Sequence, residues 1–483
     1  MQPLDEVARF EESLRGSSDD LQTLAAFFDK GDILVVRVPA RLDIMGGIAD
    51  YSGSNVCEGT LGRGVVLGLQ RRADEWIKLR SQDVRRDNLA LDFAFSLNNF
   101  YSGGRLKSYR ELCAFFQRNT IVTWAAYLIG AVFTLLKEKK IDRLEHGFNI
   151  ALISNVPMGA GIGSSATVEV AMLYGLDQQL GLGLAPRELA RLGQITENRV
   201  VGAPCGRMDQ IAAACGRANE LIHILCRPDR IVGMVDIPAN CAFAGINSMV
   251  KHTVAGPKYT DTRVATFMGR RIIFEHAKTL EKKRRTPLAR FYLTSVTPQQ
   301  FEKHYKRLLP NKITGEQFLE HYGDAGDPAT HVVPQKTYFV RSRTAHPIYE
   351  NARVLRFIEA LKTAHYTGDD KHLVEAGRHM YAAHDSYAKN CNLSCPEVDF
   401  IVAQAKKLGP RRGLYGAKIT GGGSGGTVAV LGRPDTLEDA IAEIADAYRI
   451  ETGLTPDVFL GTSPGAFQFG HFHYALAWAP RHH

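Results

Sequence analysis

The chain has 483 residues, of which 45% are hydrophobic and 23% are charged, and it carries a net charge of +8. This composition is ordinary for a globular protein, and the length predicts two to three domains' worth of core. The positive charge favours an anionic ligand, but the basic runs Lys137–Lys140 and Lys282–Arg285 contain no aromatic residues. We interpret these runs as solvated faces, which argues against a nucleic-acid partner.

The cysteines and the hydropathy pattern indicate the cellular compartment in which the protein is expected. Eight cysteines are scattered without the paired spacing of zinc sites, so reduced thiols are expected rather than a zinc centre. The N-terminus is acidic, unlike a signal peptide. The apolar run Ala125–Leu136 is too short to span a membrane. We therefore expect a cytoplasmic protein without a membrane partner.

The first stretch of interest follows the first predicted strand. Residues 1–30 have helical spacing and predict an N-terminal helical extension, and residues 33–38 predict a strand. Pro39–Gly53 comes next and is dense in Arg, Asp and Gly. We interpret it as a polar loop that could hold a polyol, because carboxylates accept hydroxyl hydrogen bonds and Arg neutralises negative charge. The alternative is a turn-rich connection without a functional role.

The stretch Asn155–Ala166 is the strongest local signal. After strand patterns within 64–79 and a helix pattern at 123–137, an apolar run at 148–153 predicts another strand. Residues 167–176 then predict an amphipathic helix, so three glycines and two serines lie in a loop that opens a helix. Free backbone N–H groups and the helix dipole converge at such a place, which suits a phosphate.

Three other interpretations of this loop were weighed. It is not a Walker P-loop, because no Gly-Lys-Ser/Thr follows the glycines. It is a poor dinucleotide fingerprint, because its spacing is Gly-x-Gly-x-Gly and no βαβ unit begins the chain. The remaining alternative is a tight turn from strand to helix with Ser164 as the N-cap.

Two acidic residues downstream are candidates for chemistry. Residues 186–202 predict a helix that carries Glu197, and the Gly- and Pro-rich bend at 202–211 carries Asp209. A carboxylate on such a bend is a candidate base, although a buried aspartate capping a helix is equally common.

The rest of the chain predicts a second domain. Residues 221–226 and 231–237 predict strands, and we place a domain boundary near them. The expected division is an extension at 1–30, a first domain at 31–230 and a second domain at 231–483. Helices are predicted at 346–364 and 371–389, and Gly416–Thr427 is a second glycine-rich stretch.

Three motifs in this order resemble the GHMP small-molecule kinases. Arg41–Gly53 is similar to their sugar-kinase signature, Pro157–Ala166 to their phosphate loop and Gly416–Gly426 to their third glycine motif. The Cys205–Gln210 segment and the spacing from His252 to Tyr259 are similar to the galactokinase branch. Four longer segments resemble L-arabinokinases within that branch: Gly46–Gly53, Phe267–Arg270, His346–Asn351 and Lys418–Gly426. The resemblance extends from about residue 33 to about residue 432.

The resemblance implies an α+β, two-domain GHMP kinase fold. Its N-terminal domain is like ribosomal protein S5 domain 2, its C-terminal domain is ferredoxin-like, and the active site lies between them. It also implies ATP as co-substrate with Mg²⁺, and a small-molecule sugar as the other substrate. A monomer or small homo-oligomer is expected.

The resemblance also assigns roles by position. Asp209 matches the catalytic base and Arg41 the arginine beside it. Ser165 and Glu197 match the residues that hold Mg²⁺. Positions that match ATP-binding residues are Gly159, Ala160, Gly161, Ile162, Gly163, Ser164 and Ser165, with Trp124 and Tyr127 near the adenine. Positions that match sugar-binding residues are Gly47, Ile48, Asp50, Gly206 and Tyr259.

Several positions of this chain differ from the family pattern, and they affect which sugar is expected as the substrate. Galactokinases carry Glu-His where this chain has Gly47-Ile48, and that pair is associated with the C6 hydroxyl of the sugar. Ala40 replaces a usual glycine, Arg207 replaces a usual apolar residue, and 59–61 lacks an apolar-Pro pattern. The implied activity is that of an ATP-dependent sugar 1-kinase for L-arabinose. The alternatives are a galactokinase, a uronic acid 1-kinase or a non-catalytic sugar- and ATP-binding sensor.

Overall fold

The structure is a computed structural model that describes residues 4–16, 23–251, 256–280 and 287–476. His252 and the basic run Lys282–Arg285 lie outside these ranges. Within them, no helix is both long and apolar enough to cross a membrane.

A large sheet forms the first half of the molecule. Its path runs β16 (His471–Leu476), β1 (Gly31–Met45), β2 (Asn55–Arg71), β7 (Phe148–Ser154), β3 (Trp76–Ser81) and β4 (Asp92–Ser96). β8 (Glu220–Leu225) joins the far end of β2 and pairs with β9 (Arg230–Asp236). Every pairing is antiparallel except that of β3 with β7.

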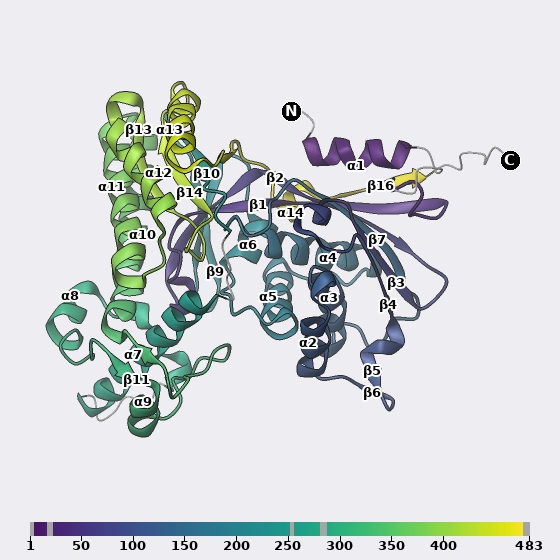
Figure 1. Cartoon of the computed structure of the whole chain (residues 1–483), viewed down its shortest axis with the longest axis horizontal. Coiled ribbons are helices and arrows are strands. Elements are labelled where there is room, and N and C mark those ends of the chain that lie inside the picture. The colour runs from purple at the N-terminus through teal and green to yellow at the C-terminus, as the bar shows by residue number, and fades with distance from the viewer. Residues whose placement is uncertain (1–3, 17–22, 252–255, 281–286, 477–483) are drawn as a thin grey trace.

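Helices cover both faces of this sheet (Figure 1). α3 (Ala125–Lys137), α4 (Ser164–Leu180), α5 (Pro186–Thr196) and α6 (Met208–Cys215) lie on one face, with α2 (Tyr109–Arg118) beyond them. α1 (Asp5–Arg15) lies on the other, where Phe10 and Leu14 pack on strand residues. The helix predicted at 167–176 is confirmed as part of α4, but its predicted amphipathic character is wrong, because α4 is buried on nearly all sides between the sheet and α3, α5 and α6.

A second sheet carries the C-terminal half. β13 (Leu414–Ile419), β14 (Thr427–Gly432), β10 (Ala242–Asn247) and β15 (Asp457–Phe459) are hydrogen-bonded in that order, all antiparallel. With α12 (Pro396–Leu408) and α13 (Leu437–Thr452) they give the chain order β-α-β-β-α-β of a ferredoxin-like unit. The expected α+β fold with a ferredoxin-like second half is confirmed.

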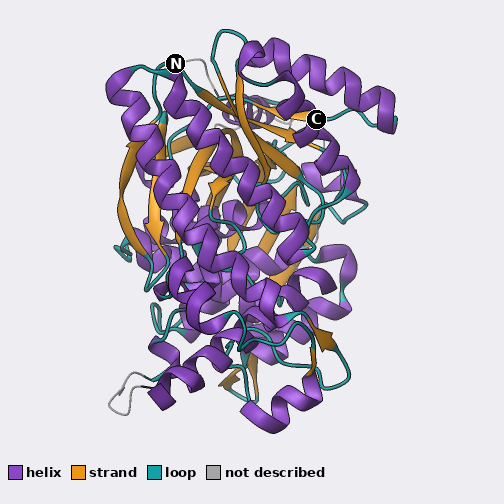
Figure 2. Cartoon of the chain, turned by 90° about the vertical axis from the view of Figure 1, so that its left-hand side faces the viewer, coloured by secondary structure: helices purple, strands orange, loops and turns teal. Residues whose placement is uncertain are grey.

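A long helical segment separates β10 from α12. It contains α7 (Pro257–Leu280), α9 (Gly315–Tyr322), α10 (Val340–Thr367) and α11 (Asp370–Ser386), with the short α8 (Pro298–Gln300). Figure 2 shows helices of this half in front of the strands. α10 also contacts β1 and β2 of the large sheet, so it reaches the first half of the molecule.

The chain crosses between the two halves more often than the sequence indicates. The expected division at residue 230 falls inside β9, whose partner β8 belongs to the large sheet. The last strand, β16, returns to pair with β1. The range 231–483 therefore contains strands of both sheets.

The interpretation of Pro39–Gly53 as a loop is wrong for its first half. β1 continues to Met45 through two register shifts, at Pro39/Arg41 and Asp43/Met45, so Arg41 and Asp43 lie on a strand. Both are buried against β2, where Arg41 faces Thr60 and Asp43 faces Glu58. Buried charges in a strand break the hydrophobic pattern that marks strands in a sequence.

A buried ion pair fastens α1 to the sheet. Glu6 and Arg37 are both fully buried, and their side chains approach to 2.7 Å. Arg37 also donates to Ser463 Oγ at 2.5 Å, and Asn155 Nδ2 donates to Glu6 at 2.9 Å. One carboxylate therefore links the N-terminal helix, β1, the C-terminal segment and the first residue of the glycine loop.

We expect Glu6→Ala to lower the free energy of unfolding by about 3–5 kcal/mol, because it leaves the Arg37 guanidinium buried without its counter-ion. Urea unfolding measures this loss. Glu11→Ala is the matched control on the same helix, since Glu11 pairs with an exposed arginine, Arg15, and its removal should cost less than about 1 kcal/mol. Equal losses in the two variants would contradict the assignment.

Candidate active site

The glycine loop lies between β7 and α4. Gly159, Gly161 and Gly163 all have positive φ, at 73°, 74° and 77°, which glycine adopts readily. Gly163 precedes the first helical residue and makes no side-chain cap, so the alternative that Ser164 caps the helix is wrong. The first-turn N–H groups of α4 therefore remain open toward the loop.

The second glycine-rich stretch packs against this loop. Thr427 Oγ1 donates to Ala160 O at 2.8 Å. A Cβ on Gly421 would lie 2.7 Å from Gly161 O, and one on Gly426 would lie 2.7 Å from Ala160 O. Glycine is therefore required at both positions for the two backbones to approach, and Gly421 and Gly422 line the same cavity as the loop.

Arg41 joins the glycine loop to Asp209. Its backbone N–H donates to Ile162 O at 3.1 Å and its Nη1 to Gly161 O at 2.8 Å. Its Nε and Nη2 donate to the two carboxylate oxygens of Asp209 at 3.0 and 2.6 Å. Asp209 lies in the first turn of α6 rather than on a bend, and 24% of its side chain is exposed.

A buried charge network continues from this pair. Asp43 Oδ2 accepts from Lys418 Nζ at 3.0 Å and from Gly421 N at 3.1 Å, and Asp43 N donates to Thr420 Oγ1 at 2.9 Å. Tyr387 Oη donates to Gly421 O at 2.8 Å. The network ties β1 of the large sheet to the loop after β13 of the second sheet. Asp43 and Lys418 were missed in the sequence, although Asp43 lies two positions after Arg41 and so on the same strand face.

Two adjoining cavities meet at the glycine loop. The first measures about 300 Å³ and the second about 490 Å³, and both are lined by Tyr127, Gly159, Ser164 and Ser165. The first cavity is lined by these predicted site residues: Arg41, Ile48, Asp50, Tyr127, Gly159, Gly161, Gly163, Ser164, Ser165, Glu197, Gly206, Asp209 and Tyr259. Trp124 and Ala160 line the second cavity, where Trp124 Nε1 donates to Ala90 O at 2.8 Å.

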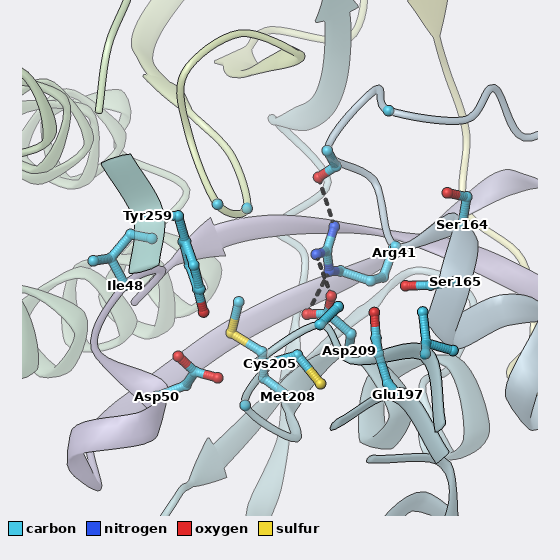
Figure 3. Close-up of a pocket in the computed structure, with 18 of the residues that line it drawn as sticks. Arg41, Ile48, Asp50, Ser164, Ser165, Glu197, Cys205, Met208, Asp209 and Tyr259 are labelled. Carbon is cyan, nitrogen blue, oxygen red and sulfur yellow. Dashed lines mark hydrogen bonds and ion pairs between the residues drawn. The ribbon is translucent and has the colours of Figure 1, made fainter. Parts of the chain in front are cut away.

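The residues of the first cavity divide into two groups about Asp209. In Figure 3, Ser164, Ser165 and Glu197 lie on one side of the Arg41–Asp209 pair. Ile48, Asp50 and Tyr259 lie on the other side. The carboxylate of Asp209 therefore stands between the glycine loop and a separate polar and aromatic compartment.

Two predicted residues do not line either cavity. Ile162 is fully buried beneath the loop, where its carbonyl accepts from Arg41. Gly47 lies behind Ile48, and a Cβ added to it would stand 1.8 Å from Tyr387 Oη and 2.3 Å from Asp43 Oδ2. Ile48 itself has φ 61°, which costs a β-branched residue roughly 1–3 kcal/mol.

Burial raises the pKa values of the two carboxyl groups that flank Asp209. Burial, followed by the charge of Asp209, raises the pKa of Asp50 to about 7. Burial also raises the pKa of Glu197 to about 7, although a hydrogen bond with Ser165 opposes the change.

Gln210 Nε2 donates to Glu197 at 2.9 Å and to Glu169 at 3.1 Å. Glu169 was missed because a lone acidic residue in a buried helix gives no motif.

Arg207 takes no part in the cavity. Its Nε donates to Gln194 Oε1 at 2.8 Å, and its Nη1 pairs with Asp229. The guanidinium that replaces the usual apolar residue is therefore held by Gln194 and Asp229 and lines neither cavity.

Comparison with known proteins identifies the family. The model of the GHMP kinases N terminal domain matches residues 126–217, and that of the GHMP kinases C terminal matches residues 357–450. The chain therefore contains the N-terminal and C-terminal domains of the GHMP kinases. The two matched ranges contain the glycine loop and the second glycine-rich stretch, so the resemblance inferred from the motifs is confirmed.

Individual relatives narrow the likeness. The L-arabinokinase of Arabidopsis thaliana is 36% identical over 91% of this chain and 46% of its own length, so the chain spans about half of that relative. A galactokinase of Actinobacillus pleuropneumoniae serotype 5b is 28% identical, over 89% of this chain and 92% of its own. The crystal structure of Lactococcus lactis galactokinase complexed with galactose has the same fold, with a TM-score of 0.70 at 20% identity, covering 96% of this chain and 99% of that one.

The raised pKa of Asp50 predicts a pH dependence of stability in the ligand-free protein. Between about pH 4 and pH 7 the folded chain keeps a proton that the unfolded chain has released. The stabilisation is therefore complete below about pH 4 and is lost as the pH rises through 7, with a span of roughly 4 kcal/mol at most. Asp50→Asn lacks this titration, so its stability relative to the parent should rise between pH 4.5 and pH 8. Urea unfolding of both proteins at the two pH values measures the difference, and a constant difference would contradict the assignment.

Proposed function

We propose that this chain transfers the γ-phosphate of ATP to the anomeric hydroxyl of a monosaccharide, with L-arabinose as its preferred substrate. The observation that carries the proposal is the position of Asp209, a partly exposed carboxylate between a phosphate-binding loop and a second compartment. Phosphoryl transfer requires an oriented hydroxyl in line with a bound phosphate, together with charge neutralisation.

The second cavity is the proposed base-binding part of the ATP site. It adjoins the glycine loop and presents Trp124 and Tyr127, with Val156, Val168 and Met249 among its apolar lining. An apolar slot with a few fixed polar groups suits a nucleobase. The open N–H groups at the start of α4 would then receive the phosphates.

Ser165 and Glu197 are the proposed protein ligands of Mg²⁺. Both side chains line the first cavity at the end of the glycine loop, so two hard oxygen donors stand beside the proposed phosphate position. Among the described residues no group of three or more His, Cys, Asp and Glu could hold a metal, which fits an ion that completes its shell with phosphate oxygens and water. When bound, Mg²⁺ would neutralise charge on the phosphates.

Arg41 and Asp209 act as a unit in this proposal. Burial lowers the pKa of Arg41, but the charges of Asp209 and Glu58 outweigh it and raise the pKa, so the guanidinium stays charged. The bidentate pair fixes the carboxylate as an acceptor for the anomeric hydroxyl, and the cation offsets charge at the reacting phosphate. The presence of this pair beside a glycine loop and Glu197 favours a catalyst over a sugar- and ATP-binding sensor.

The proposed sugar compartment contains Asp50, Tyr259 and Ile48, with Gly206 against Asp50. A Cβ on Gly206 would lie 1.3 Å from Asp50 Oδ2, so this glycine sets the position of the carboxylate. Asp50 accepts hydroxyl hydrogen bonds in the proposal. Ile48 supplies an apolar wall, which suits L-arabinopyranose because that sugar has the ring configuration of galactose without a C6 group.

A cytoplasmic location and a monomeric or small homo-oligomeric state remain predictions from the sequence.

We expect Asp209→Asn to reduce kcat by roughly two to four orders of magnitude while sugar binding and the fold persist, because the amide cannot accept the hydroxyl proton. Arg41 keeps Gly161 O at 2.8 Å and Glu58 at 3.5 Å, so the guanidinium is not left without partners. Single-turnover assays and sugar titration calorimetry separate the two effects. Asp229→Asn is the matched control, since it breaks an Asp–Arg pair away from the cavity. Near-parental turnover in Asp209→Asn would remove Asp209 from an essential role.

We expect kcat/KM for L-arabinose to exceed that for D-galactose by roughly tenfold to over a hundredfold. Galactose would bury its C6 hydroxyl against Ile48 without a partner, at a cost of about 1–3 kcal/mol. Assays of ADP release across pentoses, hexoses and uronic acids measure the preference. Ile48→Asn should narrow the gap, because asparagine tolerates the left-handed backbone and offers an amide to the hydroxyl. Equal or better use of galactose or a uronic acid by the parent would sink the assignment of L-arabinose.

A further inference from the structure

The turn that presents Ile48 has an unfavourable backbone conformation. Ala49 N donates to Gly46 O at 3.3 Å, which closes a four-residue turn with Ile48 in third place. A positive φ at this place normally selects glycine or asparagine. Ile48 nevertheless has φ 61° and is 3% exposed in the wall of the first cavity. The neighbouring structure must therefore hold the turn in place.

Helix α10 supplies two hydrogen bonds to this turn. His346 Nε2 donates to Gly47 O at 3.0 Å, and Gly46 N donates to Glu350 Oε1 at 3.2 Å. The two residues are four positions apart, so they project from one face of the helix. Both are fully buried, and neither lines either cavity.

The hydrogen bonds around His346 fix its tautomer. Asn390 Nδ2 donates to Ser386 Oγ at 2.9 Å, which leaves the Ser386 hydroxyl hydrogen for His346 Nδ1, also at 2.9 Å. The remaining ring proton is then on Nε2 and points at Gly47 O. The orientation of the Glu350 carboxylate is also fixed, because Arg353 Nη1 donates to its other oxygen at 2.9 Å.

The opposite side of the turn is closed as well. Tyr387 Oη and Asp43 Oδ2 stand so close to Gly47 that they leave no space for a Cβ. His346 packs edge-on against Tyr387, with ring centroids 5.2 Å apart. The turn therefore lies between α10 and the Asp43–Tyr387 wall, and Ile48 faces the cavity as a result.

We propose that His346 and Glu350 are positioning residues for sugar selection, which hold Ile48 in its left-handed conformation from outside the cavity. This inference rests on the proposed sugar-kinase function. It places part of the specificity for the sugar in a helix about 300 residues away in sequence, at 346–350 rather than at 46–50. Loss of either hydrogen bond should let the turn relax and withdraw the apolar wall.

The test compares four variants with the parent. His346→Phe keeps a ring beside Tyr387 but removes the donor to Gly47, and Glu350→Leu removes the acceptor for Gly46 N. Each should lower kcat/KM for L-arabinose about tenfold and reduce its ratio to D-galactose at least about fivefold, with KM for ATP within about twofold. Glu350→Gln retains an acceptor oxygen and should keep the parental ratio. Ser386→Ala removes only the hydroxyl that donates to His346 Nδ1. It should lower the ratio of kcat/KM for L-arabinose to that for D-galactose by a smaller factor.

His223→Phe is the matched control for the loss of a buried imidazole, because His223 Nε2 bonds Asn55 Oδ1 at 2.8 Å and does not touch the turn. It should lower Tm without changing the sugar ratio. A His346→Phe variant that loses activity equally on both sugars would show a merely structural role and overturn the inference. If His346→Phe does not fold, an unchanged sugar ratio in both Ser386→Ala and Glu350→Leu would overturn the inference.

A crystal structure of Glu350→Leu or His346→Phe provides a readout that does not depend on the substrate. Departure of Ile48 from positive φ supports the inference, and retention of φ near 61° overturns it whichever sugar the enzyme uses. Failure of the proposed function has a different signature, because the parent would then consume no ATP with any sugar of the panel.

Discussion

The buried guanidinium of Arg41 is the interaction on which the rest of the site depends. Removing such a charge from water costs several kcal/mol unless hydrogen bonds and a counter-ion compensate it. Asp209 supplies both carboxylate oxygens, and Gly161 O supplies a third acceptor. Each partner lies on a different element, α6 and the glycine loop, so satisfying one cation on β1 fixes their relative positions. The same bonds that stabilise the charge thereby hold the glycine loop and the carboxylate of Asp209 on opposite sides of one side chain.

A second buried cation sets the two halves of the molecule against each other. Lys418 comes from β13 of the second sheet, yet both of its hydrogen bonds go to Asp43 on β1. Neither side chain has exposed surface, so a displacement of one sheet that separated this pair without admitting water would leave two buried charges unpaired, at a cost of several kcal/mol. Glu58 adds a further carboxylate beside Arg41 and Asp43, and burial followed by the charge of Asp43 raises its pKa. The position of the second glycine-rich stretch over the first follows from this charge balance.

Sequence patterns predicted the parts of the site that depend on backbone conformation. The glycines of 159–163 and 421–426 were visible because positive φ and close backbone approach leave few other residues possible. The α+β fold with a ferredoxin-like second half followed from the family resemblance. The continuation of β1 to Met45 and the near-complete burial of α4 were not predicted, because both place charged residues inside the fold: Asp43 and Arg41 in β1, and Glu169 in α4. A hydrophobicity pattern interprets such residues as exposed and cannot show the partner, hundreds of residues away, that makes their burial possible.

The same limit explains why the Gly47-Ile48 pair cannot be understood from its own motif. A glutamate at position 47 would require space that Tyr387 Oη and Asp43 Oδ2 occupy, and Asp43 is itself held by Lys418. The glycine is therefore a consequence of the interface between the two halves, whereas the isoleucine next to it faces the cavity. Exchanging the pair for the Glu-His of galactokinases would insert a third carboxyl group beside Asp43 and Glu58, against the charge balance that closes the interface. Introducing the Glu-His pair must consequently be accompanied by changes on β1, α10 and the segment after α11, because Asp43, His346, Glu350 and Tyr387 together determine what the turn can hold.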